Sequence, residues 1–200
     1  MRKLLICLAA TAALCSAQAQ SGDFTGFSAG GNLAMNAGGY SITSAEGTDD
    51  GAGKQSLGVG GFVGYGLSMG SAFIITLGFD YSFSDIKAFE GTTGSSTSSK
   101  LQNLSSVSIA PGTMLTDKTL AYFKLGFENG KAASTIDGTT NTTNISGTSW
   151  GLGTKTLFSK NTFLQVEIKQ TNFRATRFEN SITDITARGT TGSVGVGFMF

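Results

Sequence analysis

Large apolar residues occupy every second position near the end of the chain. Val194, Val196, Phe198 and Phe200 alternate with small or polar neighbours, and only Met199 breaks the pattern. A period of two predicts a β-strand with one apolar face and one slim face. A terminal strand with an unpaired edge and an apolar face would promote aggregation in a soluble protein. We therefore expect this strand to close a barrel whose outside faces lipid.

The same alternation recurs in seven earlier segments. It predicts strands at about residues 27–36, 56–67, 73–83, 105–115, 121–128, 149–156 and 164–171, before the last at 192–200. The segment 73–83 is the most regular, because six large apolar side chains share one face. The segment 105–115 is the least regular, because Pro111 removes a hydrogen-bond donor from the ladder.

The connections between these strands alternate between long and short. Polar segments rich in Gly, Ser and Thr span 38–54, 84–100, 129–147 and 172–188, whereas short turns lie at 68–71, 116–118 and 158–161. Residues 91–99 are too polar to pack and are predicted to be mobile. The pattern predicts an all-β fold: an eight-stranded antiparallel up-and-down transmembrane β-barrel with four long outer loops and three short periplasmic turns.

A soluble eight-stranded barrel, similar to a lipocalin, would show the same alternation, but with its apolar face inside and its polar face outside. Its water-facing surface should be rich in Lys and Glu. Here the polar face is mostly Gly, Ser, Thr and Asn, and charged residues make up only 14% of the chain, against roughly 25% in soluble domains. The polar face therefore suits a narrow lumen, and the apolar face suits lipid.

The N-terminal residues are predicted to direct export. Arg2 and Lys3 precede an uncharged run at 4–14 and the A-x-A sequence at 17–19, so residues 1–19 are predicted to be a cleaved signal peptide and 20–200 the barrel domain. Eleven apolar residues are too few for a membrane-spanning helix, which needs about 20. Both cysteines lie in the signal, so no disulfide framework is expected. The predicted location is the outer membrane.

Net charge offers no basis for nucleic-acid binding. Removing Arg2 and Lys3 from the 14 basic residues leaves 12 against 13 acidic ones, a formal charge of −1. Nucleic-acid binding requires a basic surface, so that partner class is set aside.

Six charged side chains fall on the lumen face. Unpaired charges in a narrow interior are costly, so we expect them to pair with one another. By depth, Lys124 matches Glu167, and Lys169 matches either Glu128 or Asp80. The network is interpreted as a polar plug, with a gated constriction as the alternative. It comprises Asp80, Lys124, Glu128, Lys155, Glu167 and Lys169.

Aromatic residues lie near the predicted strand ends. Tyr and Trp rings favour the boundary between lipid and headgroups, so girdles are expected at both levels of the barrel, in contact with outer-membrane lipids. The girdle candidates are Phe73, Phe83, Phe127 and Trp150.

Three segments resemble a known family. Residues 107–127, the hairpin from Trp150 to Glu167, and the terminal residues Val194, Val196, Phe198 and Phe200 are similar to parts of the small eight-stranded outer-membrane barrels, including opacity-type surface antigens and OmpA- and OmpX-type porin-like proteins. The family often carries a proline where Pro111 stands. The resemblance implies that the terminal strand is the signal read by the barrel-assembly machinery.

Catalytic chemistry has little support in the sequence. It contains no histidine, which most acid–base and metal chemistry near neutral pH requires. Outer-membrane lipases, lipid A deacylases, acyltransferases and omptin-type proteases resemble one another in needing one. We therefore expect no cofactor, no metal and no enzyme. The first functional hypothesis is a surface protein that displays polar loops for adhesion, host or matrix contact, or envelope integrity. A narrow channel for small or apolar solutes is the alternative, and a lipid-modifying enzyme is the least favoured.

Overall fold

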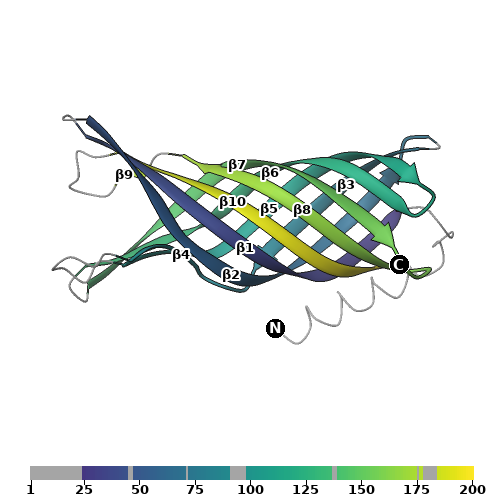
Figure 1. The fold of residues 1–200 in the computed structure, drawn as a ribbon, viewed down its shortest axis with the longest axis horizontal. Helices are drawn as coiled ribbons and strands as arrows, with labels where there is room; N and C mark the ends of the chain where they lie inside the picture. The colour runs from purple at the N-terminus through teal and green to yellow at the C-terminus, as the bar shows by residue number, and fades with distance from the viewer. Residues whose placement is uncertain are drawn as a thin grey trace.

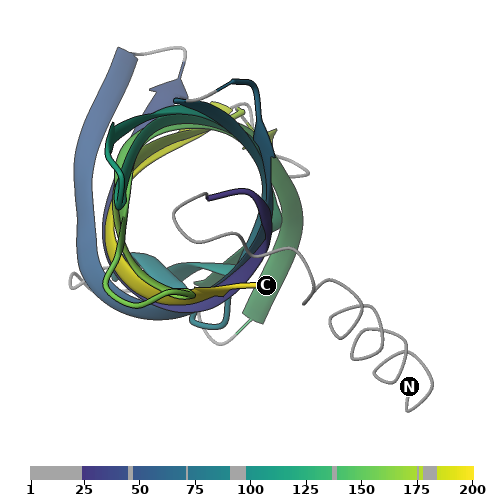
Figure 2. The ribbon, with the colours of Figure 1, turned by 90° about the vertical axis from the view of Figure 1, so that its right-hand side faces the viewer.

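A single antiparallel sheet closes on itself to form a barrel. In this computed structural model, β1 (Gly26–Ser44) pairs with β2 (Gly47–Ser68) on one side and with β10 (Asp184–Met199) on the other. Between them stand β3 (Phe73–Ser82), β5 (Ser98–Thr116), β6 (Thr119–Ile136), β7 (Thr139–Leu157) and β8 (Thr162–Phe173). Figures 1 and 2 show the closed wall from the side and from one end. The structure describes residues 24–44, 47–70, 72–90, 98–136, 139–174, 176–177 and 184–200.

Two short strands prolong two of the longer ones, so the wall consists of eight staves, each a long strand together with any short extension of it. The strand β4 (Ile86–Glu90) pairs with β5, as β3 does. The strand β9 (Thr176–Arg177) pairs with β10, as β8 does. The predicted fold class, an eight-stranded antiparallel barrel, is confirmed. Within the described part of the chain, no helix has the length and apolar character needed to cross a membrane.

Burial alternates along each stave in the predicted sense. In β8, the side chains of Phe163, Gln165 and Glu167 are buried, whereas Leu164, Val166 and Ile168 are 41–58% exposed. The apolar face therefore lies on the outside of the wall and the polar face in the lumen. A soluble barrel would bury its apolar face, so this arrangement excludes the lipocalin-like alternative.

The strands extend well into the segments predicted to be long loops. The ladder between β1 and β2 continues to Ser44 and Gly47, and the ladder between β6 and β7 continues to Ile136 and Thr139. The expectation of loops at 38–54 and 129–147 was wrong for most of their residues, which form β-hairpins. Water can cover both faces of a hairpin outside the membrane, so these strands need no apolar period, and Thr-rich ladders pair well.

The other two predicted loops contain the additional strands. Residues 84–100 include β4 and the start of β5, and residues 172–188 include β9 and the start of β10. Most of the predicted mobile segment 91–99 and the whole predicted signal peptide 1–19 lie outside the described residues. The short turns are where they were predicted, between β2 and β3, β5 and β6, and β7 and β8.

The proline in β5 is accommodated without a shift of register. The pairing between β5 and β6 is interrupted at Ala110 and Pro111 and resumes at Gly112, which faces Tyr122 in the register that Ile109 and Leu125 had set. On its other side, Pro111 lies opposite Ile75 of β3. The missing donor therefore costs ladder bonds locally and leaves the stave intact.

Candidate functional site

The six charged residues predicted for the lumen all point into it. Because their positions share the inward parity of their strands, they approach one another across the barrel from β3, β6, β7 and β8. Lys124, Glu128, Lys155 and Glu167 are each at most 8% exposed. These charges lie well out of water, so their partners decide whether they stabilise the fold.

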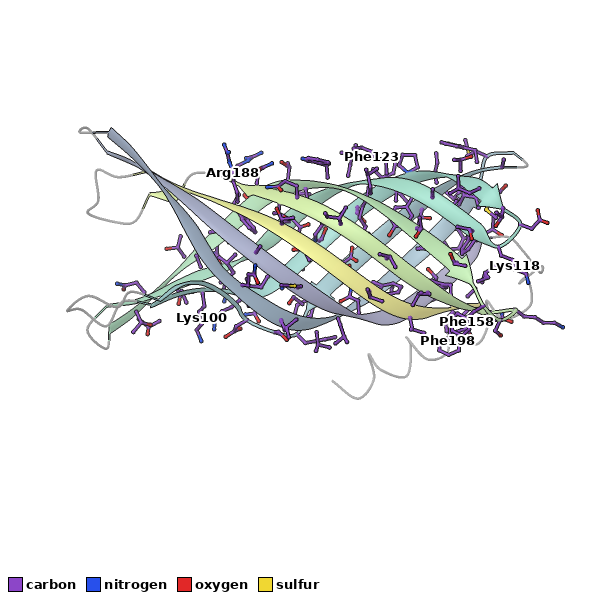
Figure 3. All side chains as sticks on the ribbon, in the orientation of Figure 1. Lys100, Lys118, Phe123, Phe158, Arg188 and Phe198 are labelled. Carbon is purple, nitrogen blue, oxygen red and sulfur yellow. The ribbon has the colours of Figure 1, made fainter. Side chains whose placement is uncertain are left out.

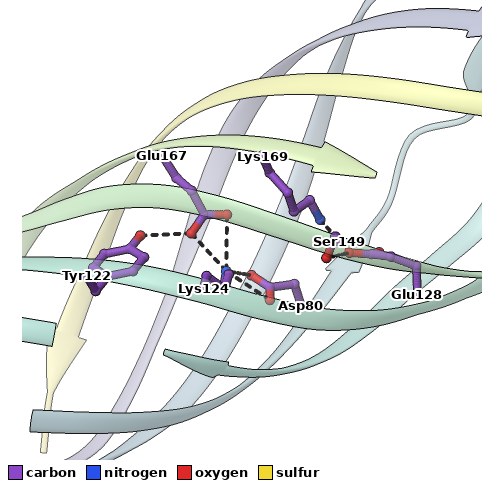
Figure 4. A network of polar contacts seen from close by, with 7 residues as sticks. All are labelled: Asp80, Tyr122, Lys124, Glu128, Ser149, Glu167 and Lys169. Atoms are coloured by element: carbon purple, nitrogen blue, oxygen red, sulfur yellow. Dashed lines mark hydrogen bonds and ion pairs between the residues drawn. The ribbon is translucent and has the colours of Figure 1, made fainter. Parts of the chain in front are cut away.

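Lys124 is the centre of the larger group of contacts. Its Nζ lies 2.9 Å from Glu167 Oε2 and 3.2 Å from Asp80 Oδ2. The Tyr122 hydroxyl donates to Glu167 Oε2 at 2.8 Å. Figure 4 shows this group, in which strands β3, β6 and β8 each contribute a side chain. One ammonium group thus joins two carboxylates that the sequence separates by 87 positions.

A second ion pair completes the network of polar contacts in the lumen. Lys169 Nζ lies 2.9 Å from Glu128 Oε1, and Ser149 Oγ donates to the same carboxylate oxygen at 2.7 Å (Figure 4). Of the two partners considered for Lys169, the structure pairs it with Glu128, while Asp80 contacts Lys124. The pairing of Lys124 with Glu167 matches the depth argument made from the sequence.

Lys155 departs from the expectation that the lumen charges pair with one another. No carboxylate lies within ion-pair distance of it among the described residues. Its Nζ lies 5.2 Å from the centre of the Phe163 ring and 5.8 Å from that of Tyr122. It also lines a cavity of about 30 Å³ together with Ser108, whose buried Oγ has no hydrogen-bond partner in the described part of the chain. Ring faces therefore stabilise this cation in place of the third carboxylate, which Lys124 already occupies.

An apolar cluster that was not predicted from the sequence fills the lumen at the end with the short turns. Phe163 is fully buried, and its ring packs against Phe24 at 6.4 Å and Phe62 at 6.0 Å between centroids. Phe24 is 2% exposed and packs on Phe163, so it lies in the lumen. Figure 2 shows that the described chain begins inside the ring. The cluster comprises Phe24, Phe62, Ile74, Leu120, Leu157, Phe163 and Met199.

Two features of the sequence could have indicated this cluster. Met199 breaks the alternation of the last strand, and Phe62 is the one large apolar residue on the slim face of its strand. Both are inward-facing and at most 7% exposed. Met199 and Phe62 both belong to the cluster that seals the lumen.

The outer half of the lumen holds a vestibule. Its cavity of about 110 Å³ reaches the charged network at Asp80, Glu128, Glu167 and Lys169. Near its mouth, Thr191 Oγ1 donates to Asn36 Oδ1 at 2.8 Å. No described group of three or more acidic side chains is arranged to hold a metal ion. The lumen thus consists of a vestibule, a charged layer and an apolar seal, in that order from the outside.

Aromatic side chains project from the outside of the wall. The four predicted girdle residues are exposed: Phe73 by 42%, Phe83 by 69%, Phe127 by 43% and Trp150 by 49%. In the last strand, Val194, Val196 and Phe198 also face outward. Phe200 closes the seam, since its N–H donates to the Phe27 carbonyl at 2.8 Å and the two rings lie 5.7 Å apart.

Comparison with protein families identifies this architecture. The family described as outer membrane protein beta-barrel domain matches residues 6–200. The chain belongs to this family. It is an outer-membrane β-barrel protein, and its apolar outer wall faces the lipid of the bacterial outer membrane.

Solved structures of small outer-membrane barrels share the fold. The attachment invasion locus protein Ail of Yersinia pestis, solved in complex with the heparin analogue sucrose octasulfate, is 14% identical, with a TM-score of 0.51 over 88% of this chain and 100% of that one. Neisserial surface protein A is 13% identical, with a TM-score of 0.52 over 88% of this chain and 98% of that one. No curated protein sequence matches the chain. At these identities the likeness concerns the fold alone.

Proposed function

We propose that this barrel is a non-enzymatic surface protein that displays its outer hairpins for adhesion, contact with a host or matrix ligand, or envelope integrity. The observation that carries the proposal is the closure of the lumen at two levels. The ion pairs centred on Lys124 span the middle of the barrel, and the apolar cluster around Phe163 fills the end with the short turns. A barrel closed in this way offers its outer end for contact.

The outer hairpins supply the surface for that contact. The β1–β2 and β6–β7 ladders remain paired through long polar segments outside the apolar belt (Figure 1). Backbone pairing makes them stiffer than free loops, so a partner would meet a partly preorganised surface. Binding function commonly lies in the segments that a rigid scaffold projects.

Truncation of the hairpins tests the proposal. Because Gly130 pairs with Ile145 and Tyr40 pairs with Gly51, residues 131–144 and 41–50 can each be replaced by a two-residue turn without a change of register. We expect both truncated proteins to remain folded, which is checked by their heat-modifiable migration in detergent gels. Cells that carry them should lose binding to immobilised matrix proteins or to heparin, a probe chosen because Ail was crystallised with a heparin analogue.

Two outcomes would overturn the display proposal. One is failure of the truncated proteins to insert, because the hairpins would then serve the barrel itself. The other is unchanged surface binding and unchanged sensitivity of cells to detergent when both hairpins are removed together.

A narrow gated channel is the second candidate. It is favoured by the cavities of about 110 and 30 Å³ that lie on either side of the charged layer and share Asp80 as a lining residue. Planar-bilayer recordings distinguish the two functions. Reproducible conductance that changes in Lys124→Ala or Glu167→Ala would establish the channel, whereas a silent wild-type protein supports display.

Enzymatic activity is excluded from the proposal because the chain contains no histidine and its lumen carboxylates are occupied by ion pairs and hydrogen bonds. Turnover of lipid A or phospholipid by purified protein in outer membranes would contradict this part.

We further propose that residues 1–19 are removed on export, that Phe73, Phe83, Phe127 and Trp150 form the girdles, and that the terminal strand is the assembly signal. Phe200→Ala should impair outer-membrane assembly in cells, because Phe200 both ends the signal and packs on Phe27 at the seam. Phe158→Ala, in an exposed turn, is the matched control. Normal assembly of the Phe200 variant would contradict the proposed signal.

A further inference from the structure

An open apolar groove of about 720 Å³ crosses the outer wall over β1, β10, β8, β7 and β6. The strand register places Met35, Gly192, Ile168 and Leu152 in one row across these strands. The next row towards the short turns contains Val194, Val166, Thr154 and Ala121.

Small residues create the depression in this wall. A Cβ placed on Gly192 would have no atom within 4 Å, which shows how open the wall is at that point. Ala121 and Thr154 lie side by side at the far end of the groove. The larger side chains of Met35 and Ile168 stand on either side of Gly192 and remain at least half exposed. Because the chain spans the outer membrane, the groove faces lipid.

The wall becomes polar directly outside the groove. The next row contains Trp150, Gln170 and Thr190, and Thr190 Oγ1 donates to Gln170 Oε1 at 2.7 Å. One row further out, Arg188 faces Asn172 across the β8–β10 ladder. Arg188 is exposed and projects from the outside of the wall (Figure 3).

A second arginine lies two residues beyond Asn172, the partner of Arg188 in the β8–β10 ladder. Arg174 follows the buried Phe173 at the end of β8, and its side chain is exposed. Four residues separate Gly192 from Arg188, which is about 13 Å along the strand at roughly 3.3 Å per residue. This spacing places Arg188 outside the apolar rows of the groove, at the border of the apolar belt where headgroups begin. Arg174 follows the end of β8 on the same side of the belt.

We propose that this face is a binding site for a phosphate-bearing lipid of the outer leaflet, with one acyl chain in the groove and the phosphate at Arg188 and Arg174. Guanidinium groups bind phosphate oxygens through paired hydrogen bonds. Basic residues at a membrane surface recognise anionic headgroups in this way. Thr190 and Gln170, between the two parts of the site, offer further hydrogen bonds to the lipid backbone.

A second copy of the chain fits this face less well than a lipid. A two-fold interface over the groove would bring the same arginines of both copies towards each other. Juxtaposed like charges disfavour such contacts, whereas an anionic headgroup complements them.

Native mass spectrometry of the full-length barrel in detergent tests the site. The probe is lipid A carrying two phosphates, and the same lipid after enzymatic removal of its phosphates is the reference. Wild-type protein should prefer the phosphorylated lipid. Arg188→Ser with Arg174→Ser should lower its apparent affinity by about thirtyfold, which corresponds to about 1 kcal/mol for each surface arginine.

Three further variants separate headgroup, groove and net charge. Arg188→Ser alone should weaken binding by a smaller factor, and it leaves the other contacts of Arg174 in place. Gly192→Trp fills the groove, so it should weaken binding of both forms of the lipid. Lys118→Ser with Lys160→Ser removes two exposed positive charges from the short turns and should leave the affinity unchanged.

The proposal is overturned if the arginine variants bind the phosphorylated lipid as wild type does, or if the short-turn variant loses as much affinity as they do. It is also overturned if Gly192→Trp has no effect. A concentration-dependent dimer in place of lipid adducts would assign the face to self-association instead.

Discussion

Removal of the Lys124 charge is the perturbation that tests most directly whether the lumen network holds the barrel together. Lys124 contacts Glu167 at 2.9 Å and Asp80 at 3.2 Å, and the three side chains are between 6% and 19% exposed. Lys124→Met keeps much of the side-chain volume but leaves two carboxylates without a cation. Lys155 cannot replace it without moving, because its Nζ lies over the rings of Phe163 and Tyr122.

The expected cost follows from this burial. Breaking a buried ion pair by removing one partner costs about 3–5 kcal/mol, because the remaining charge stays buried without compensation. Glu167→Gln should cost less, about 1–3 kcal/mol, since Lys124 keeps Asp80 as a partner. The triple variant Lys124→Met, Asp80→Asn and Glu167→Gln removes every charge of the group, so it should recover most of the loss.

The free energy of unfolding can be measured by guanidinium titration of the barrel in lipid vesicles. The fluorescence of Trp150 reports the transition, because it is the only tryptophan in the chain and faces the lipid. Lys118→Met, in an exposed turn, is the control and should change the free energy by less than about 0.5 kcal/mol. A loss below about 1 kcal/mol for Lys124→Met, or a triple variant as unstable as the single one, would refute a stabilising role for these ion pairs.

Three further changes probe other levels of the barrel. Phe163→Ala should destabilise the barrel by about 3–5 kcal/mol in the same titration, because the ring is fully buried in the apolar seal. Phe158 is 64% exposed, so Phe158→Ala should have little effect. Equal losses in the two variants would show that the seal contributes nothing to stability. Gly153→Ala should lower the free energy of unfolding by about 1–3 kcal/mol, because its Cβ would clash with the Tyr122 ring and lie 2.8 Å from the Val166 carbonyl oxygen. Gly192→Ala should be nearly neutral. A larger loss for Gly192→Ala than for Gly153→Ala would contradict this packing. Hydrogen bonds from Gln102 and Lys100 lower the pKa of Asp85. Above the ordinary carboxyl pKa they should therefore slow hydrogen exchange in the β4–β5 hairpin relative to an unstructured peptide at the same pH, and this protection should be lost as the pH falls through the lowered pKa. Asp85→Asn should remove the pH dependence of the protection, and an unchanged protection profile in that variant would exclude Asp85 as its cause.

The alternation of side chains was sufficient to predict the faces of the wall. Because successive residues of a strand point to opposite sides, the sequence placed Leu164, Val166 and Ile168 outside and Gln165, Glu167 and Lys169 inside, as the structure has them. The number of staves and the positions of the short turns followed from the same pattern. The outer hairpins were not predictable in this way, since their ladders run through Thr, Asn and Ser with no buried face to impose a period.

Contacts across the lumen depended on how the barrel closes. The stagger of the strands decides which inward residues meet at one height, and no local pattern encodes that stagger. For this reason the sequence left two partners for Lys169, and the closed barrel gave it Glu128 and gave Asp80 to Lys124. In the same closed barrel, Lys155 Nζ lies over the rings of Phe163 and Tyr122.

The sequence by itself determined that this chain is a membrane barrel with apolar residues outside and balanced charges inside, because both features repeat with the period of a strand. Only the tertiary structure decided where the lumen is sealed. Phe24, Phe62, Phe163 and Met199 come from distant parts of the chain and meet because the wall closes at β1 and β10. An apolar contact of this kind depends on position in three dimensions, which alternation along one strand does not specify.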